Sequence, residues 1–326
     1  MIIVRSPLRI SIGGGGTDLP VFYENNNGTV FSSLAINKYI YISITKRFQE
    51  EVLIRYLENE EVKDLRRIRH DIFRETLLDV DKKINSVEIT STSDVPGGTG
   101  LGSSGAFGVA LQMALRSYLN LPYSKDLLSK ESTKIEMDIL KRPIGLQDQY
   151  ISAYGSLTEF KVDNKSNVKI NKPTINPNVD KVLSNNLLLF YANKNRNAST
   201  VLKSDQKMMV DSKKKKNFLD IVQLGICMYE ALLDADISEY GKLMHDYWLL
   251  KRERQKQFTD QGINNLYDHI YQKKLAYGGK LVGAGGSGFL LFATDSPENL
   301  RKEVKKFGMR ELEFSRDIEG TKLIEL

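Results

Sequence analysis

Residues 96–106 have the composition of a loop that binds an anion. Their sequence, Pro-Gly-Gly-Thr-Gly-Leu-Gly-Ser-Ser-Gly-Ala, places five glycines around two serines. Alternating β-branched residues over 86–92 predict a strand before the loop, and apolar residues over 106–115 predict a helix after it. Free N–H groups at the start of such a helix, with the positive end of its dipole, favour a phosphate. The segment therefore predicts a triphosphate site, where the serine hydroxyls add donors or a metal ligand.

Two widespread phosphate-binding loops do not match this segment. A Walker A loop requires a lysine that is missing here, and a Rossmann loop requires an acidic residue at the end of a following strand. The competing interpretation is an ordinary tight turn between a strand and a helix. Such a turn needs only one or two glycines, so the larger number favours ligand binding.

Two further glycine clusters flank this segment along the chain. Residues 13–16 are four consecutive glycines that lead into Thr17 and Asp18. Composition alone would favour a flexible linker. Because a predicted strand precedes the glycines and structured sequence follows, we instead expect a ligand surface with Thr17 and Asp18 at its rim. The third cluster, over 283–288, leads directly into an apolar strand pattern, so we expect it to form a pocket wall.

Acidic residues in two places could take part in chemistry. Asp148 lies in a glycine-flanked, apolar and amide-rich stretch over 144–155, where a structural cap is about as frequent a role as a functional one. A helix predicted over 124–141 carries Glu131 and Glu136. The residues alone leave the roles of these acids open.

The remaining patterns predict a chain of mixed α and β structure. We expect further strands at 2–7, 8–12, 29–36, 39–45 and 187–191. We expect further helices at 61–78, 205–234, 238–257 and 263–276. The polar stretch over 161–180, which contains two prolines, is the best candidate for a domain boundary.

Composition restricts the class of protein. The 326 residues, with 41% hydrophobic and 27% charged residues, are typical of a globular chain of two domains. No apolar run has the length of a membrane span, and Met1 leads directly into sequence that looks structural. The single cysteine, Cys227, excludes an internal disulfide and suits a reducing compartment. We therefore expect a cytoplasmic protein without a membrane partner.

The net charge of +6 permits an anionic partner. Nucleic acid is one candidate, and phosphorylated metabolites and nucleotides are others. The chain lacks a stripe of interleaved aromatic and basic residues, and glycine clusters do not explain base or backbone recognition. We therefore expect small-molecule ligands and no nucleic acid. With three scattered histidines and one cysteine, a structural zinc site is not expected.

The three glycine clusters, in this order, resemble the motifs of the GHMP kinases, and the resemblance covers the whole chain. The first motif corresponds to 7–14, the second to 96–106 and the third to 280–288. This resemblance implies an α+β, two-domain GHMP kinase fold. Its N-terminal, ribosomal-S5-like domain would span 1–175 and bind the nucleotide. A C-terminal, ferredoxin-like α/β domain over 176–326 would complete the substrate pocket.

Within that family, the first motif is most similar to that of the sugar kinases. Thr17 and Asp18 match the galactokinase pattern, whereas Gly15 and Gly16 replace its Glu and His, which argues against galactose. The all-glycine version resembles the fucokinase and heptose-phosphate kinase branch. The modest chain length favours the D-glycero-D-manno-heptose 7-phosphate kinases, which phosphorylate the anomeric hydroxyl on the path to GDP-heptose for surface polysaccharides.

The resemblance implies a role for particular residues. Asp148 and Arg9 would be catalytic, with Asp148 accepting or orienting the proton of the sugar hydroxyl. ATP would bind to Pro96, Gly97, Gly98, Gly100, Leu101, Gly102, Ser103, Ser104 and Gly105. The cofactor Mg²⁺ would bind to Ser103 or Ser104 and to Glu136. The substrate would contact Gly14, Gly15, Gly16, Thr17, Asp18, Gly285, Gly286 and Arg196. A substrate phosphate would need a basic site, for which Lys141, Arg142, Lys194 and Arg196 are candidates by charge and loop position alone.

Alternatives remain within and outside this interpretation. One is a kinase for an unphosphorylated sugar such as fucose. Another is a nucleotide and sugar sensor without catalysis, against which the presence of Arg9, Glu136 and Asp148 argues. Oligomeric state leaves no readable trace in the sequence.

Overall fold

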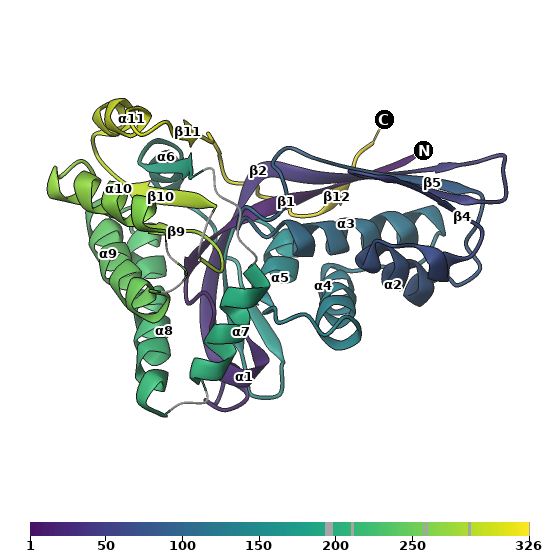
Figure 1. The fold of residues 1–326 in the computed structure, drawn as a ribbon, viewed down its shortest axis with the longest axis horizontal. Helices are drawn as coiled ribbons and strands as arrows, with labels where there is room; N and C mark the ends of the chain where they lie inside the picture. The colour runs from purple at the N-terminus through teal and green to yellow at the C-terminus, as the bar shows by residue number, and fades with distance from the viewer. Residues whose placement is uncertain (193–197, 210–211, 257, 259, 286–287, 326) are drawn as a thin grey trace.

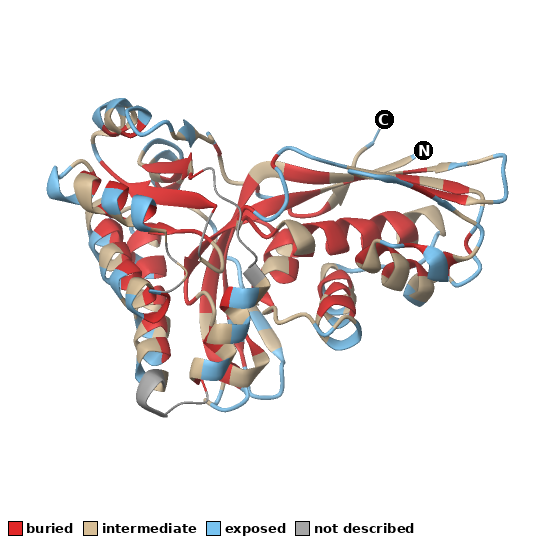
Figure 2. Cartoon of the chain, viewed as in Figure 1, coloured by how far each residue is buried: buried red, intermediate tan, exposed pale blue. Residues whose placement is uncertain are grey.

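The computed structural model describes residues 1–192, 198–209, 212–256, 258, 260–285 and 288–325. The chain forms two lobes, each built on its own sheet, and strands β1 and β2 run from one lobe into the other (Figure 1). Buried residues concentrate along these strands and along helix α3 (Figure 2). None of the described helices is both long enough and apolar enough to span a bilayer.

The first sheet has eight strands, in the order β12-β1-β2-β5-β3-β4, with β6 and β7 continuing from β2. All pairs are antiparallel except β3 with β5. The strands are β1 (Ile2–Gly13), β2 (Thr29–Lys46), β3 (Val52–Arg55), β4 (Asn59–Val62), β5 (Val87–Ser93), β6 (Leu157–Val162), β7 (Val168–Asn171) and β12 (Lys322–Leu323). One face of this sheet is covered by helices (Figure 1), which are α2 (Asp71–Val80), α3 (Ser103–Tyr118), α4 (Lys125–Lys134) and α5 (Gln147–Tyr154).

Strands β1 and β2 are each continuous where the sequence predicted two strands. The polar pair Asn37-Lys38 was expected to separate the two halves of β2, and it forms a bulge instead. Pro7 pairs with Tyr39 and Leu8 pairs with Ile36, so the two residues between have no partner in β1. The long strands therefore bend without breaking, and β1 extends to the first glycine cluster.

The predicted helix over 61–78 is wrong in its first half. Asn59–Val62 forms β4, a 3₁₀ turn follows at Leu65–Arg67, and α2 begins only at Asp71. The cause is the buried carboxylate of Glu60, which accepts the backbone N–H groups of Arg69, at 2.6 Å, and His70, at 3.1 Å. These bonds span nine and ten residues of sequence and hold the charged segment between β4 and α2 in a turn, whereas its composition alone suits a helix.

The second sheet has four strands in the order β11-β8-β10-β9. They are β8 (Leu187–Tyr191), β9 (Gly278–Leu281), β10 (Phe289–Ala293) and β11 (Arg310–Glu311). Numbered along the chain, this order is 4-1-3-2 and every pair is antiparallel, which gives the ferredoxin-like β-α-β-β-α-β connectivity. Its helices are α6 (Pro177–Asn185), α8 (Ser212–Leu233), α9 (Ile237–Arg254), α10 (Gln261–Gln272) and α11 (Pro297–Lys305). The predicted two-part α+β fold is confirmed.

The division of the chain at residue 175 stays a prediction, and the pairing of β12 qualifies it. The break falls between β7 and α6, as the polar stretch indicated. However, Val4 pairs with Leu323 and Arg5 with Lys322, so the segment that contains β12 returns to the first sheet. Residues close to the C-terminal end therefore belong to the lobe that contains β1.

Helix α8 of the second lobe packs directly on β1 and β2. The contact depends on two glycines, Gly13 at the end of β1 and Gly225 in α8, whose backbones touch. A Cβ atom on Gly225 would lie 2.9 Å from the carbonyl carbon of Gly13 and 3.0 Å from the Cα atom of Gly14. No side chain fits between the two segments without a shift of backbone.

This contact predicts that Gly225→Ala destabilises the protein by about 1–3 kcal/mol, because overpacking forces the helix away from the strand. Urea denaturation, followed by circular dichroism, measures the change. Gln223→Ala, at an exposed position of the same helix, is the matched control and should unfold at the wild-type midpoint. An unchanged midpoint for Gly225→Ala would contradict the packing described here.

Candidate active site

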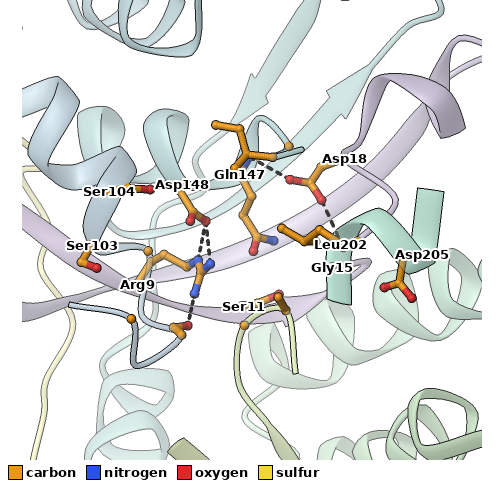
Figure 3. Close-up of a pocket in the computed structure, with 18 of the residues that line it drawn as sticks. Arg9, Ser11, Gly15, Asp18, Ser103, Ser104, Gln147, Asp148, Leu202 and Asp205 are labelled. Carbon is orange, nitrogen blue, oxygen red and sulfur yellow. Dashed lines mark hydrogen bonds and ion pairs between the residues drawn. The ribbon is translucent and has the colours of Figure 1, made fainter. Parts of the chain in front are cut away.

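A cavity lies where β1, the loop over 96–102, the start of α5, helices α7 (Ala198–Met209) and α9 and the third glycine cluster meet (Figure 3). The two lobes both contribute to it. The residues that line the cavity include Arg9, Asp18, Gly100, Asp148, Lys251 and Gly283.

The loop over 96–102 has the backbone geometry that the sequence predicted. It connects β5 to α3, and Gly98, Gly100 and Gly102 have φ values of +77°, +85° and +75°. Only glycine adopts such angles without strain. Gly102 caps α3, so the first N–H groups of this helix have no intrahelical partner and point toward the loop. Ser103 and Ser104 stand at the start of the helix and line the cavity.

The third glycine cluster packs backbone to backbone on that loop. A Cβ atom on Gly283 would lie 3.0 Å from the carbonyl carbon of Gly100, and one on Gly100 would lie 2.8 Å from the carbonyl oxygen of Val282. Gly283 and Ala284 line the cavity. Gly285, a predicted substrate contact, instead lies against Gln255, and Gly286 lies outside the described residues. Gly283 and Ala284 therefore contribute to a wall of the cavity, whereas the substrate contacts at Gly285 and Gly286 stay predictions.

Arg9 and Asp148 form an ion pair in the wall of the cavity (Figure 3). The Nε and Nη2 atoms of Arg9 lie 2.8 Å and 2.6 Å from Oδ1 of Asp148. Gly102 of the loop and Gly105 of α3 make room for the pair, because a Cβ atom on Gly105 would lie 2.6 Å from Cβ of Asp148 and one on Gly102 would lie 3.2 Å from its Cγ. The Asp148 side chain is 27% exposed, so its carboxylate is open to a ligand.

Glu136 lies behind this pair, on a π-helical turn at Ile135–Ile139 that follows α4. Its side chain is fully buried, and it accepts hydrogen bonds from Gln149 at 2.8 Å and Arg142 at 3.1 Å. Burial raises the pKa of this carboxyl, while Arg142, Gln149 and the Ser104 hydroxyl oppose the shift. The contact with Ser104 joins the acid to the start of α3.

The oxygens of Glu136, Ser103 and Ser104 fit a hard cation such as Mg²⁺. No three His, Cys, Asp or Glu residues within the described parts of the chain form a metal cluster. Magnesium does not need one, because it is usually held by one or two carboxylates together with substrate phosphates. A cation near Glu136 would also favour ionisation of a carboxyl whose pKa burial raises.

The first glycine cluster brings Asp18 to the cavity but not Thr17. The Asp18 carboxylate accepts the backbone N–H groups of Gly16 at 3.1 Å and Gln147 at 3.0 Å, so it joins this cluster to the start of α5. Burial, and to a smaller extent the charge of Asp148, raise its pKa. The Thr17 hydroxyl is buried against Thr29 at 2.8 Å, outside the cavity. The structure therefore gives Thr17 a role in holding the loop.

Helices α7 and α9 contribute a part of the cavity wall that was not predicted from the sequence. Lys251 donates to the carbonyl oxygens of Leu281, at 3.0 Å, and Gly283, at 2.6 Å. Arg254 donates from Nε to Asp205 at 3.1 Å, and both residues are buried. These residues line the cavity, whereas the sequence Lys-Arg-Glu-Arg at the end of α9 suggests only a solvated helix end.

Comparison with known proteins finds similarity to GHMP kinases. The family model of the GHMP kinases N terminal domain matches residues 67–156. A D-glycero-alpha-D-manno-heptose 7-phosphate kinase of Campylobacter jejuni is 29% identical, over 98% of this chain and 98% of its own. Residues 67–156 therefore correspond to a GHMP kinase N-terminal domain.

Two more distant similarities are to a fucokinase and to a heptose-phosphate kinase. An L-fucokinase/L-fucose-1-P guanylyltransferase of Bacteroides fragilis is 22% identical, over 90% of this chain and 34% of its own. The crystal structure of a D-glycero-D-manno-heptose 1-phosphate kinase from Bacteroides thetaiotaomicron has a TM-score of 0.80 at 20% identity, and the match covers 100% of this chain and 99% of that one. This last similarity establishes the fold alone.

Of the basic residues that were expected to bind a substrate phosphate, the two that the structure describes are Lys141 and Arg142, and neither lines the cavity. Arg142 forms a bidentate pair with Asp71, at 2.8 Å for each oxygen, and also binds Glu136. Arg142 therefore helps to hold Glu136, the predicted magnesium ligand. Lys141 is exposed and does not line the cavity, and Lys194 and Arg196 lie outside the described residues.

The lowered pKa of Lys251 predicts how the stability of the protein depends on pH. Burial and the neighbouring Arg254 lower its pKa from 10.5 to about 7. Between these values the unfolded chain binds a proton at this lysine that the folded chain does not, so the free energy of unfolding should rise with pH over that window. Lys251→Met removes the titration, and the wild type should gain stability relative to this variant between pH 7 and pH 9.5. Urea denaturation at the two pH values measures the difference, and a difference independent of pH would contradict the prediction.

Proposed function

We propose that this protein is an ATP-dependent sugar kinase that phosphorylates the anomeric hydroxyl of a sugar phosphate. The best-supported substrate is D-glycero-D-manno-heptose 7-phosphate, which would become the 1,7-bisphosphate on the path to GDP-heptose. The observation that supports phosphoryl transfer most directly is the Arg9–Asp148 pair, which faces the cavity beside the glycine loop and the start of α3. The reaction would take place in the cytoplasm, where ATP is available.

The choice of substrate is supported by the relatives. The similarity to the Campylobacter jejuni heptose 7-phosphate kinase extends over nearly the full length of both chains. The similarity to the Bacteroides fragilis fucokinase is weaker and covers only 34% of that protein. A kinase for an unphosphorylated sugar such as fucose is therefore the second candidate. A sensor without catalysis is less well supported, because a sensor would not need the Arg9–Asp148 pair that faces the cavity.

The loop over 96–102 and the start of α3 would bind the triphosphate. The free N–H groups of Ser103 and Ser104 and the helix dipole favour the negative charge of phosphate oxygens. Arg9 lies beside them, with Nη1 bonded to the carbonyl oxygen of Gly100. Its guanidinium would stabilise charge on the transferred phosphoryl group, because phosphoryl transfer depends mainly on positioning and electrostatic stabilisation.

Asp148 would act on the sugar hydroxyl. Its carboxylate, held by Arg9, would orient the anomeric O–H toward the γ-phosphorus and receive its proton as the new O–P bond forms and the bond to the ADP oxygen breaks. Asp18, with Gln147, would bind other sugar hydroxyls on the neighbouring wall. These contacts would hold the acceptor in line with the leaving group.

Glu136 and one of Ser103 and Ser104 would hold the magnesium ion. When bound, Mg²⁺ would neutralise charge on the phosphate oxygens of ATP. Gln149 and Arg142 keep the Glu136 carboxylate in place through its two oxygens. Glu136 does not itself line the cavity, so its hydrogen bond with Ser104 is the contact that supports a ligand role.

The proposal predicts ATP consumption with D-glycero-D-manno-heptose 7-phosphate and a new phosphate on the anomeric carbon. A coupled ADP assay over a panel of sugars and sugar phosphates measures turnover, and ³¹P NMR identifies the phosphorylated position. Fucose, galactose and mannose serve as unphosphorylated comparators. Higher turnover of fucose than of the heptose phosphate would favour the second candidate, and phosphorylation at a carbon other than C1 would contradict the mechanism.

We further predict that Asp148→Asn lowers kcat at least about 10²-fold and leaves the fold intact, because the amide cannot take the proton of the acceptor. Steady-state kinetics and circular dichroism provide the two measurements. Asp126→Asn, an exposed aspartate on α4 outside the cavity, is the matched control and should retain wild-type turnover. Near-normal turnover of Asp148→Asn would reject the assignment.

A further inference from the structure

Lys251 and Arg254 lie three residues apart on α9, on the face of the helix that lines the cavity. They approach it from the second lobe, whereas Arg9 and Asp148 approach it from the first. Both side chains are almost completely buried. Buried cations are ordinarily paired with an anion, so the partners of these two residues indicate what else the cavity can bind.

The charge of Lys251 has no carboxylate in contact with it among the described residues. Arg9 is paired with Asp148, and Arg254 is paired with Asp205. The ammonium group of Lys251 instead donates to two carbonyl oxygens, which are neutral. An ammonium group has three N–H donors, so one remains for a ligand. An anion in the cavity would favour the protonated form of Lys251, whose charge no contacting carboxylate among the described residues compensates.

The guanidinium of Arg254 also has an edge that faces the cavity. Its Nε atom binds Asp205 and its Nη1 atom binds Asn217 at 3.2 Å. Its Nη2 atom lies 3.8 Å from the position that a Cβ atom on Gly16 would occupy. Because Gly16 has no side chain, this edge is left open toward the glycines of the first cluster. Gly16 is one of the two positions at which this chain departs from the galactokinase pattern.

The end of the cavity with Asp205 and Arg254 is remote from the loop serines. Figure 3 shows Ser103, Ser104 and Asp148 on one side of the cavity and Asp205 on the opposite side, with Gln147 between them. The nucleotide loop and the start of α3 already supply an anion site on the first side. A second anion at the Asp205 end would therefore belong to the acceptor and not to the nucleotide.

Two further polar groups in the cavity wall lack a partner. The Nε2 atom of Gln147 and the hydroxyl of Ser11 are buried without a hydrogen-bond partner in the described part of the chain. Both residues line the cavity and are at least nine-tenths buried. Buried donors without partners are rare in folded proteins. Their presence beside two cations indicates a ligand rich in oxygen acceptors.

We propose that Lys251 and Arg254 bind the phosphate group that the sugar substrate already carries. The inference rests on the proposed sugar phosphate kinase function and names the residues that would select the phosphorylated acceptor. The substrate would extend from Asp148, which receives its anomeric hydroxyl, to α9, which receives its phosphate. Gln147 and Ser11 would donate to oxygens between the two ends.

Lys251→Met tests the proposal, because methionine keeps the length of the side chain and removes the charge. We expect kcat/KM for D-glycero-D-manno-heptose 7-phosphate to fall at least about 10-fold more than kcat/KM for unphosphorylated D-glycero-D-manno-heptose, since hydrogen bonds to charged groups are among the stronger ones. The KM for ATP provides the second readout and should change less than about 3-fold.

Lys172→Met is the matched control. Lys172 also donates to two backbone carbonyl oxygens, those of Tyr154 and Ile318, each at 2.8 Å, but it does not line the cavity. It should retain the wild-type preference for the phosphorylated sugar. An equal loss for both sugars in Lys251→Met, or a loss of preference in Lys172→Met as large as in Lys251→Met, would overturn the proposal.

A second variant tests Arg254 without leaving a buried charge unpaired. Removing Arg254 alone would leave Asp205 buried without its partner. The double variant D205N/R254Q removes both charges and should lose the same preference for the phosphorylated sugar. A wild-type preference in a folded D205N/R254Q protein would exclude Arg254 from the site.

Titration calorimetry without ATP separates this proposal from the proposed function. The wild type should bind D-glycero-D-manno-heptose 7-phosphate at least about 10-fold more tightly than the unphosphorylated heptose, and Lys251→Met should lose most of that difference. Binding with this preference but without turnover would reject the kinase function and support the phosphate site. Turnover without such a preference in the wild type would reject the site and leave the kinase function in place.

Discussion

Arg9 joins two parts of the site, the glycine loop and the start of α5. Its backbone N–H donates to the carbonyl oxygen of Leu101 at 2.9 Å, and its side chain reaches both the carbonyl oxygen of Gly100 and the carboxylate of Asp148. A single residue of β1 therefore positions the glycine loop and the start of α5 relative to each other. Because β1 lies within the first sheet and α8 packs on its far end, this residue has a rigid support.

The sequence predicts the parts of the site that depend on local backbone geometry. The glycines over 96–102 are required by positive φ angles, and Gly102 and Gly105 are required by the close approach of Asp148. Such constraints leave a signal in composition, since no other residue meets them. The strand before the loop and the helix after it could be predicted for the same reason. The family motifs then indicated Arg9 and Asp148, although 139 residues separate them.

Contacts between distant segments were not predictable in this way. Residues 61–78 look helical, yet Glu60 holds part of them in a turn through bonds to Arg69 and His70. Thr17 matches a sugar-kinase motif, yet its hydroxyl is hydrogen-bonded to that of Thr29. Lys251 belongs to a charged run typical of a solvated helix end, and only the approach of α7 and the third glycine cluster buries it. In each case the decisive partner lies on another element, and composition carries no information about it.

The pairing of β12 with β1 links the most distant parts of the chain. The hydroxyls of Ser6 and Thr321, 315 residues apart, are bonded at 2.7 Å beside this pair of strands. During synthesis on the ribosome, the outer edge of β1 at Val4 and Arg5 therefore stays uncovered until almost all of the described chain has emerged. An uncovered strand edge can pair with another chain, and contacts of such long sequence separation form slowly. The strand that carries Arg9 is thus among the last to be completed, and the nascent protein exposes it in the meantime to wrong partners.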